Sequence, residues 1–327
     1  MKLNIYYNVN GDHGLNYGLG HIYRAIEIIK KLKKKSIKCS VITDSPVNII
    51  DFIKREIKVR IIKRSCVRLL KTNENDILIN DTLGKDLRIN SIFEKKKSKI
   101  INLDISRINF KKGIVINSII HYKKKIKTNR NIKYFGGFKY LITRNFFQDV
   151  NKKIEKKNIY FISSGGADFN NFSIKICKIL LNIKVHKIYL MLGRAVKYTY
   201  IKKIKNKFKN ENKIKILFNV KNPKKYLDMS KFAIVSGGNI LFESLSSNCC
   251  VMAVQNYFHQ SFAIKYLAKK KSIINLGLLK KINKKKICKS IKSYENKKNN
   301  ILSIRRKIID YKGLDRVVNI IYNYSRV

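Results

Sequence analysis

The chain has 327 residues, enough for two domains that each bury a hydrophobic core of their own. Hydrophobic residues make up 45% of it, which excludes an intrinsically disordered chain. Lys and Arg number 73 against 20 Asp and Glu, which gives a formal net charge of +53. The lysines are spread over the whole chain together with many Ile and Asn residues, a composition typical of an AT-rich genome. This bias explains much of the charge, and the alternative is a selected contact with an anionic membrane surface or an anionic substrate.

The cysteines and the N-terminal residues bear on the cellular compartment. The six cysteines show neither CxxC spacing nor a Cys/His cluster with zinc spacing, so reduced thiols are expected and a zinc finger is excluded. The first residues enter a predicted strand without an apolar leader, and no apolar run reaches the roughly 18 residues that a membrane-spanning helix needs. We therefore expect a cytoplasmic protein. Specific nucleic-acid binding is not expected, because neither an RNA-binding aromatic signature nor a compact basic tail is present.

Short β-branched runs alternate with longer amphipathic stretches through the first half of the chain. Apolar residues at helical spacing predict a helix over His21–Leu32, directly after a predicted strand at Leu3–Val9. The elements that follow in chain order are a strand at Lys38–Thr43, a helix at Val47–Arg55 and strands at Ile77–Asn80, Ile100–Leu103 and Ile114–Ile116. The later strands are apolar without alternation, as buried parallel strands are, and strand and helix in turn predict a doubly wound α/β sheet.

The alternation stops at Tyr140–Asn158 and then restarts, which predicts a domain boundary and two domains, 1–146 and 147–327. Strands are expected at Ile159–Ser163, Lys187–Leu192, Ile214–Asn219, Phe232–Ser236 and Val251–Val254. Helices are expected at Asn171–Leu181, Tyr200–Phe208, Pro223–Met229, Ile240–Ser247 and Gln260–Lys269, and in the tail from Lys280. The natural architecture is two doubly wound domains that face each other across a cleft.

The first motif that could carry chemistry is the segment Gly18–Arg24, between the first strand and the first helix. Its glycines would let the backbone approach a ligand, and the helix N-terminus carries a partial positive charge. His21 stands at the start of that helix, where an imidazole can act as a general base or acid on a bound sugar. The alternative is a structural turn with a surface histidine. The spacing matches neither a Rossmann fingerprint nor a Walker A loop.

Two further glycine turns follow predicted strands of the second half. Gly165 and Gly166 precede Asp168, which could cap the next helix, and their backbone N–H groups could bind phosphate. Gly237 and Gly238 open a helix on which Glu243 could accept two hydrogen bonds from a ribose diol. The alternatives are structural turns and a solvated helix glutamate.

A fourth segment, Gln255–Gln260, follows a predicted buried strand. Its polar side chains Asn256, His259 and Gln260 would face the same cleft. The alternative is an ordinary polar loop before a helix.

Six segments, in their order along the chain, resemble segments of the GT-B superfamily. Within it, the chain is similar to the UDP-sugar hydrolases of pseudaminic acid synthesis and to related spore-coat polysaccharide proteins. The N-acetylglucosaminyltransferase of peptidoglycan synthesis is a more distant resemblance. The segments are Gly18–Arg24 (GxGHxxR), Asp76–Asp81 (a strand ending in Asp), Gly137–Arg144 (GxxYxxxR), Gly165–Asp168 (GG(T/A)D), Gly237–Glu243 and Asp310–Arg316 (DGxGxxR). Each is unspecific alone, and their common order over nearly the whole chain is what carries the resemblance.

The resemblance implies a UDP-sugar substrate, with the nucleotide held mainly by the second domain. His21 is then the catalytic residue, directed at C1 of the sugar. The nucleotide-binding residues implied are Gly165, Gly166, Gly237, Gly238, Asn239 and Glu243. The sugar-binding residues expected are Gly18, Gly20, Arg24, Asn256, His259 and Gln260; the family's Asn after the last sheet strand aligns with either Asn256 or His259. No cofactor or metal is expected, because no Asp-x-Asp motif follows a strand.

The predicted function is therefore a metal-independent hydrolase that releases UDP from an amino or deoxy sugar in surface-glycan synthesis, as in pseudaminic acid biosynthesis. The alternatives are an inverting glycosyltransferase that uses the same site and a non-catalytic nucleotide-sugar binding subunit. One departure bears on the substrate: the pseudaminic hydrolases typically carry Asp-His-Tyr-Gly where this chain has Asp81-Thr82-Leu83-Gly84. The tyrosine that lies near the sugar in those enzymes is missing here, which leaves the identity of the sugar open.

Overall fold

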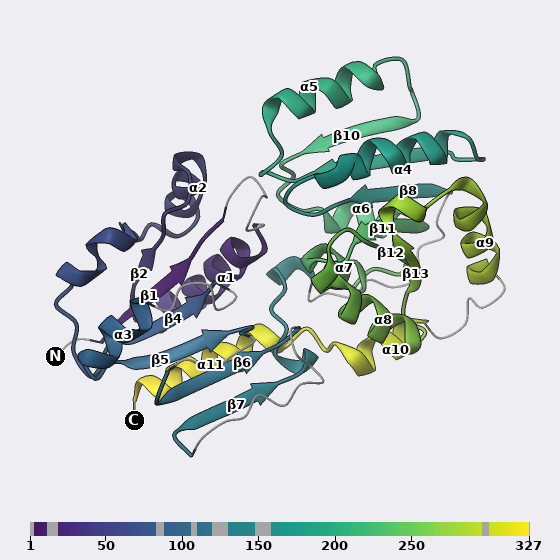
Figure 1. Ribbon diagram of the computed structural model, residues 1–327. Helices are drawn as coiled ribbons and strands as arrows, with labels where there is room; N and C mark the ends of the chain where they lie inside the picture. The colour runs from purple at the N-terminus through teal and green to yellow at the C-terminus, as the bar shows by residue number, and fades with distance from the viewer. Residues whose placement is uncertain are drawn as a thin grey trace. The chain divides into compact units, whose positions relative to one another are not determined.

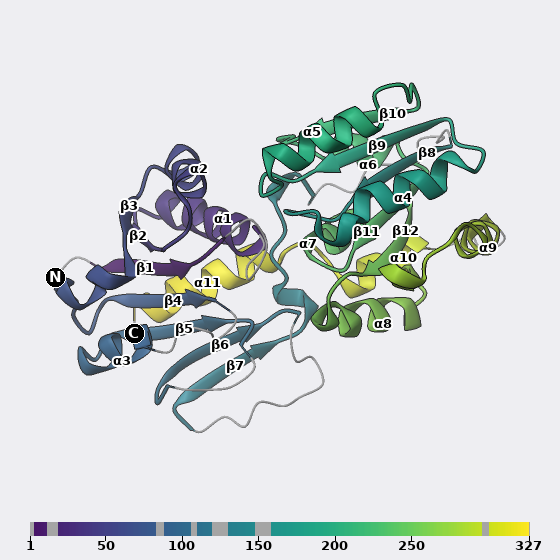
Figure 2. The ribbon, with the colours of Figure 1, turned by 45° about the horizontal axis from the view of Figure 1, so that its top comes forward.

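The computed structural model describes residues 3–11, 19–82, 88–105, 110–119, 130–147, 158–295 and 301–326. The chain divides into two compact units, and each contains a parallel β-sheet flanked by helices (Figures 1 and 2). The first unit holds the N-terminal strand, Gly20–Arg144 and the segment from Ile309 onward, and the second holds Asn145–Ile308. The predicted α/β class with two doubly wound sheets is confirmed.

The sheet of the first unit has the strand order β3-β2-β1-β4-β5-β6-β7, with every pair parallel. Its strands are β1 (Asn4–Val9), β2 (Lys38–Ile42), β3 (Arg60–Ile62), β4 (Ile77–Asp81), β5 (Lys99–Leu103), β6 (Gly113–Asn117) and β7 (Ile132–Gly136). The order reverses between β1 and β4, and such a switch point leaves a crevice for ligands at the carboxyl ends of the strands.

The helices of the first unit cover both faces of this sheet. They are α1 (Gly20–Lys34), α2 (Val47–Ile57), α3 (Arg88–Lys95), α11 (Gly313–Ser325) and the 3₁₀ segments η1 (Arg64–Leu69) and η2 (Phe138–Tyr140). Helix α1 packs against α2 and α11, whereas α3 packs with η1 over a separate cluster of buried apolar residues. This division follows from right-handed crossovers on the two sides of the switch point.

The C-terminal helix α11 belongs to the first unit, whereas the predicted boundaries placed all of 147–327 in the second domain. Its amphipathic face buries Leu314, Val317, Val318 and Ile321, and the helix packs against α1 and η2. At its first residue, Gly313, an added Cβ would lie 2.1 Å from the Leu141 carbonyl oxygen. A glycine is therefore required there for α11 to dock on the segment that follows η2.

The sheet of the second unit repeats the same winding in the order β10-β9-β8-β11-β12-β13, again all parallel. The strands are β8 (Ile159–Ser163), β9 (Lys187–Leu192), β10 (Ile214–Phe218), β11 (Phe232–Ser236), β12 (Cys250–Gln255) and β13 (Ile274–Leu278). The helices are α4 (Phe172–Leu181), α5 (Tyr198–Lys207), α6 (Lys224–Met229), α7 (Asn239–Ser244), α8 (Ser261–Lys269), α9 (Lys284–Glu295) and α10 (Ile301–Ile308). The 3₁₀ segments are η3 (Asn145–Phe147), η4 (Phe169–Asn171), η5 (Phe258–Gln260) and η6 (Leu279–Lys281).

Helices α4, α5 and α9 contribute to one apolar core cluster of the second unit, while α7 and α8 contact β12. The two middle strands of this sheet, β8 and β11, are buried along their whole length. None of the helices in the described ranges is long and apolar enough to cross a bilayer.

Candidate functional site

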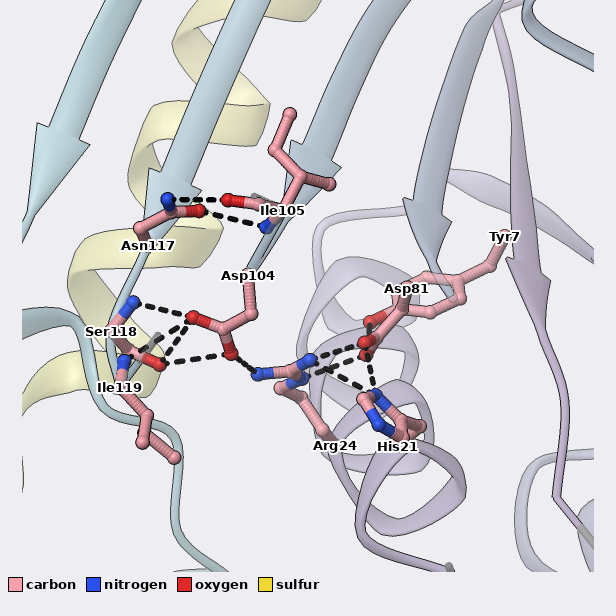
Figure 3. A network of polar contacts seen from close by, with 9 residues as sticks. All are labelled: Tyr7, His21, Arg24, Asp81, Asp104, Ile105, Asn117, Ser118 and Ile119. Atoms are coloured by element: carbon pink, nitrogen blue, oxygen red, sulfur yellow. Dashed lines mark hydrogen bonds and ion pairs between the residues drawn. The ribbon is translucent and has the colours of Figure 1, made fainter. Parts of the chain in front are cut away.

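The side chains of the first site lie around the switch point between β1 and β4. Helix α1 begins at Gly20, so His21 is its second residue and Arg24 follows one turn later. Asp81 is the last residue of β4, and Asp104 comes directly after β5. The parallel pairing of β1, β4 and β5 brings these strand ends to the same edge of the sheet, beside the start of α1 (Figure 3).

His21 is held by a buried carboxylate. Its Nδ1 lies 2.5 Å from Asp81 Oδ1, and the side chains of His21 and Asp81 are 16% and 0% exposed. A carboxylate oxygen can only accept, so Nδ1 carries the hydrogen and donates it. The second ring nitrogen, Nε2, is then the basic atom of the neutral ring. The contact thus fixes both the orientation of the ring and its tautomer.

Arg24 joins Asp81 to a second carboxylate. Its Nε donates to Asp81 Oδ2 at 2.7 Å, and its two terminal nitrogens bind Asp81 and Asp104. Burial alone would raise the pKa of Asp81, but Arg24 and His21 outweigh it and hold that pKa well below its ordinary value. Burial alone would lower the pKa of Arg24, and the carboxylates of Asp81 and Asp104 raise it instead. Asp81 and Arg24 are therefore both charged at neutral pH.

Tyr7, on β1, completes the surroundings of Asp81. Its hydroxyl donates to Asp81 Oδ2 at 3.0 Å, and the ring is fully buried. Burial and the neighbouring Asp81 charge raise the pKa of Tyr7 well above its ordinary value. The phenol therefore stays protonated and serves as a hydrogen-bond donor.

Asp104 is also held by the residues that follow β6. The backbone N–H groups of Ser118 and Ile119 donate to its Oδ1 at 2.7 and 3.3 Å, and the Ser118 hydroxyl lies 3.2 Å from both oxygens. Next to it, the Asn117 side chain exchanges two hydrogen bonds with the backbone of Ile105, at 3.0 and 2.9 Å. These contacts tie the end of β5 to the end of β6.

In the second unit, two predicted glycine turns meet at the carboxyl edge of neighbouring strands. Gly165 follows β8 with a φ of +97°, a conformation that favours glycine, and Gly237 follows β11. The Ser236 hydroxyl donates to the Ser164 carbonyl at 2.6 Å, which ties the two turns together directly.

The fourth predicted segment joins the same edge through two contacts. An added Cβ at Gly237 would lie 2.7 Å from Cβ of Gln260, so the two backbones approach closely. Asn170 Nδ2 donates to Asn256 Oδ1 at 3.2 Å, while Gln260 Oε1 accepts from the backbone N–H of Asn256 at 2.9 Å. Gln260 is thus buried and holds the loop, whereas Asn256 is partly exposed.

A helix follows each glycine turn: α7 starts directly after Gly238, and α4 starts at Phe172, after η4. Asn239 is the first residue of α7, on which Glu243 is 5% exposed, so the solvated-glutamate alternative is excluded. Asp168 accepts the backbone N–H of Ser173, the second residue of α4, at 3.1 Å, as the capping prediction required. Burial raises the pKa of Asp168, partly offset by hydrogen bonds from Ser173.

No family model matches the chain. An uncharacterized protein of Methanocaldococcus jannaschii is 28% identical over 279 residues, which cover 79% of this chain and 57% of that protein. This chain therefore spans little more than half the length of that relative. The UDP-2,4-diacetamido-2,4,6-trideoxy-beta-L-altropyranose hydrolase of Campylobacter jejuni is 23% identical over 79% of this chain and 94% of its own. The spore coat polysaccharide biosynthesis protein SpsG of Bacillus subtilis is 21% identical over 95% and 96%.

Solved structures resemble the whole chain in fold. MurG of Acinetobacter baumannii superimposes with a TM-score of 0.70 at 11% identity, covering 99% of this chain and all of MurG. Anabaena HepE in complex with UDP-glucose gives a TM-score of 0.63 at 11% identity, covering 98% and 99%. The fold is GT-B. At these identities the likeness concerns the fold alone.

In this GT-B chain, the predicted residues fall into two groups, one in each unit. His21, Gly20 and Arg24 belong to the first unit, and Gly165, Gly166, Gly237, Gly238, Asn239, Glu243, Asn256 and Gln260 belong to the second. Gly18 and the side chain of His259 lie outside the described residues. Arg24, predicted to bind the sugar, points into the unit toward Asp81 and Asp104 and is 8% exposed.

Four residues at the strand ends of the two sheets were not among the predicted ones. Asp81 was noted only as part of a motif, and Asp104 and Tyr7 were not singled out; an Asp at the end of a buried strand was the available signal. Gly193 follows β9, and an added Cβ there would lie 2.3 Å from the Gly165 carbonyl oxygen. A glycine directly after a predicted strand was the corresponding signal.

Proposed function

We propose that this protein is a nucleotide-sugar hydrolase, which uses water to release UDP from a UDP-linked amino or deoxy sugar in surface-glycan synthesis. The observation that carries the proposal is the histidine at the start of α1, whose Nδ1 lies 2.5 Å from the buried Asp81. Burying charged groups is costly, and such costs concentrate at functional sites. A surface histidine on a structural turn would need neither Asp81 nor Arg24.

In the proposed reaction, a water oxygen attacks C1 of the sugar while His21 Nε2 takes one of its protons. The bond between C1 and the diphosphate oxygen breaks, and its electron pair leaves with UDP. Asp81 accepts the Nδ1 hydrogen throughout and stabilises the imidazolium that forms. The products are the free sugar and UDP, and the proton on His21 returns to solvent. This chemistry needs neither a metal nor a cofactor, in keeping with the sequence.

The nucleotide would bind at the carboxyl edge of the second sheet. There, the backbone N–H groups of Gly166, Gly237 and Gly238 would bind phosphate, as phosphate-binding turns do. Gly165, whose N–H donates to the Ser163 hydroxyl at 3.1 Å, would shape the first turn. Asn239, which opens α7, would add its own N–H group, and Glu243 would hold the ribose hydroxyls. The tie from Ser236 to Ser164 supports one joint site, because it holds both turns at one edge.

The sugar would be bound by residues near His21 and in the loop after β12. The proposed sugar-binding residues remain Gly18, Gly20, Asn256, His259 and Gln260. Arg24 would act on the site indirectly, by holding Asp81. The Campylobacter jejuni and Bacillus subtilis relatives support a UDP-sugar of surface-glycan synthesis as the substrate. The sequence departs from the pseudaminic pattern at Thr82, which is buried, and at Leu83, which lies outside the described residues.

A glycosyltransferase that uses the same site is the second candidate. The similarity in fold to a glycosyltransferase of Rickettsia africae, with a TM-score of 0.66 at 12% identity, favours it. Incubation with a panel of UDP-sugars, with and without lipid and glycan acceptors, separates the two. UDP release without an acceptor supports the hydrolase, and release that depends on an acceptor supports the transferase. A non-catalytic subunit would bind UDP-sugars and release no UDP under either condition.

Gly238→Ala tests the nucleotide turn. The nearest protein atom to an added Cβ at Gly238 is 4.0 Å away, so the free protein should keep its melting temperature. A diphosphate seated on the turn would meet the new methyl group. UDP at 100 times Kd should stabilise the wild type by about 2.7 kcal/mol. We expect the UDP-induced rise in melting temperature of Gly238→Ala to be half that of the wild type or less. An unchanged UDP effect would place the diphosphate elsewhere.

Glu243→Gln tests the ribose contact. The amide is isosteric but carries no charge, so charge-assisted hydrogen bonds to the ribose are lost. We expect UDP affinity to fall about 10-fold to 100-fold in a titration calorimetry experiment. The matched control is Glu211→Gln, an exposed acid of the same unit, which should bind UDP normally. Equal UDP affinities of the two variants would refute the ribose assignment.

A further inference from the structure

We propose that Asp104 is a positioning residue for His21, acting through Arg24 and Asp81 on both the orientation and the charge of the imidazole. No motif of the sequence analysis included Asp104. The inference deepens the proposed function, on which its kinetic test rests, and a second test below does not depend on activity.

The first support is an unbroken chain of contacts. Asp104 binds one terminal nitrogen of Arg24, the other terminal nitrogen and Nε bind Asp81, and Asp81 binds His21 Nδ1 (Figure 3). The guanidinium is planar, with its donors in a fixed geometry. Two carboxylates on its edges therefore determine the plane of the guanidinium, and that plane determines where the Asp81 oxygens lie.

The second support is the way Asp104 itself is held. Its backbone has a φ of +50°, in the left-handed region that costs a non-glycine residue about 1–3 kcal/mol. The N–H groups of Ser118 and Ile119, which directly follow β6, donate to its carboxylate, and the side chain is 3% exposed. Such a carboxylate cannot follow Arg24 if Arg24 shifts. Asp104 thus fixes the network to the sheet, whereas Arg24 alone is a long and flexible side chain.

The third support is the charge count. Two groups of this network contact His21 Nδ1 directly: Asp81 on β4 at 2.5 Å and a terminal nitrogen of Arg24 on α1 at 3.2 Å. Tyr7 on β1 contacts Asp81, and Asp104 lies behind Arg24. The two carboxylates and one guanidinium sum to one net negative charge, and Tyr7 is neutral. When His21 takes a proton, the cluster becomes neutral. Because Arg24 neutralises only one carboxylate, the second carboxylate supplies the charge that favours the imidazolium in a buried setting.

Asp104→Asn removes that charge with little change in shape. Asn tolerates the left-handed backbone, and its side-chain oxygen can still accept from Ser118 and Ile119. The matched control is Asp76→Asn in the same unit. Asp76 is fully buried and accepts the N–H groups of Asn4 and Asn73 at 3.0 and 3.1 Å, but no contact links it to His21.

With an active UDP-sugar, we expect Asp104→Asn to lower kcat about 10-fold to 100-fold, with KM and the UDP-induced thermal shift unchanged. The acidic limb of the pH–rate profile should move to lower pH, because the protonated ring has lost a supporting charge. Asp76→Asn should lower the melting temperature and leave kcat and the profile unchanged. Normal kcat with an unmoved profile in Asp104→Asn would overturn the proposal.

The test that needs no activity is NMR of the histidine rings in ¹⁵N-labelled protein. The chain has five histidines, and the His21 signals are those missing in His21→Gln. We expect the His21 ring of the wild type to carry its hydrogen on Nδ1 and to titrate at lower pH in Asp104→Asn, while Asp76→Asn titrates as the wild type does. An identical titration in all three proteins refutes the inference. A wild type that binds and cleaves no UDP-sugar refutes only the proposed function.

If Asp104→Asn does not fold, Ser118→Ala provides the same test with the buried charges kept. It removes only the hydroxyl that lies 3.2 Å from both carboxylate oxygens. We expect kcat to fall about fivefold at constant KM, the effect of one hydrogen bond. An unchanged kcat in a folded Ser118→Ala protein would contradict the anchoring role.

Discussion

His21→Ala is expected to lower turnover of the UDP-sugar by about 10²-fold to 10⁴-fold, the usual size of a general-base contribution. The ring is presented at the start of α1, and its Nδ1 donates to the buried Asp81. Without it, no group of this network takes the proton from the attacking water. UDP affinity should change little, because the proposed nucleotide residues belong to the second unit. Steady-state kinetics and a UDP thermal shift measure the two quantities.

The control for this variant is His186→Ala, an exposed histidine of the second unit that should have wild-type turnover. A merely structural role for His21 predicts the opposite pattern, with a lower melting temperature and near-normal turnover. Full activity of His21→Ala on the true substrate, or a joint loss of UDP binding and activity, would show that the catalytic role is wrong.

Arg305→Met is expected to lower the free energy of unfolding of the second unit by about 3 kcal/mol or more. Arg305 is 2% exposed and donates to the carbonyl oxygens of Ser272, Ser247 and Cys249, each at 3.0 Å. Methionine fills similar space but leaves three buried acceptors without these donors. Helix α10 would then lose its attachment to the start of β12. Urea unfolding followed by circular dichroism measures the loss.

The neighbouring residue supplies the matched control. Arg306 stands next to Arg305 on α10 but is exposed, so Arg306→Met should change stability by less than about 0.5 kcal/mol. Equal effects of the two substitutions would mean that the three carbonyl contacts contribute nothing to stability.

The fold followed from the sequence wherever its signal was local. Apolar runs without alternation predicted β8, β9 and β11 at the residues where they occur, since a strand buried on both faces must be apolar throughout. The strands β3, β7 and β13 were missed. Strand β3 has only three residues, and one exposed lysine and one exposed tyrosine, Lys133 and Tyr134, interrupt the apolar pattern of β7.

The packing of α11 in the first unit could not be predicted from the sequence, because an amphipathic helix with one apolar face can pack against the core of either unit. Its partner is chosen by contacts far apart in the sequence, such as the ion pair between Lys31 and Asp315 and the close approach of Gly313 to Leu141. Gly313 lies in the segment Asp310–Arg316, but nothing in the sequence shows that Leu141 lies beside it.

The candidate sites were predictable to a similar degree. Glycine turns after strands located the edge of each sheet, and His21 stood out by its place at a helix start. The role of Arg24 was not apparent, because a helix start alone does not show whether a side chain turns outward to a ligand or inward to Asp81 and Asp104. Those two carboxylates meet it only through the order of β1, β4 and β5 in the sheet.

The central claim is that water attacks C1 of a UDP-linked sugar, and the most direct measurement is the fate of the solvent oxygen. The reaction is run in H₂¹⁸O without an acceptor, and the ¹⁸O content of the free sugar and of UDP is measured by mass spectrometry. We expect one ¹⁸O in the C1 hydroxyl of the sugar immediately after release and none in UDP, and His21→Ala should form both products about 10²-fold to 10⁴-fold more slowly. Label in the UDP phosphate, or no UDP release until an acceptor is added, would contradict it.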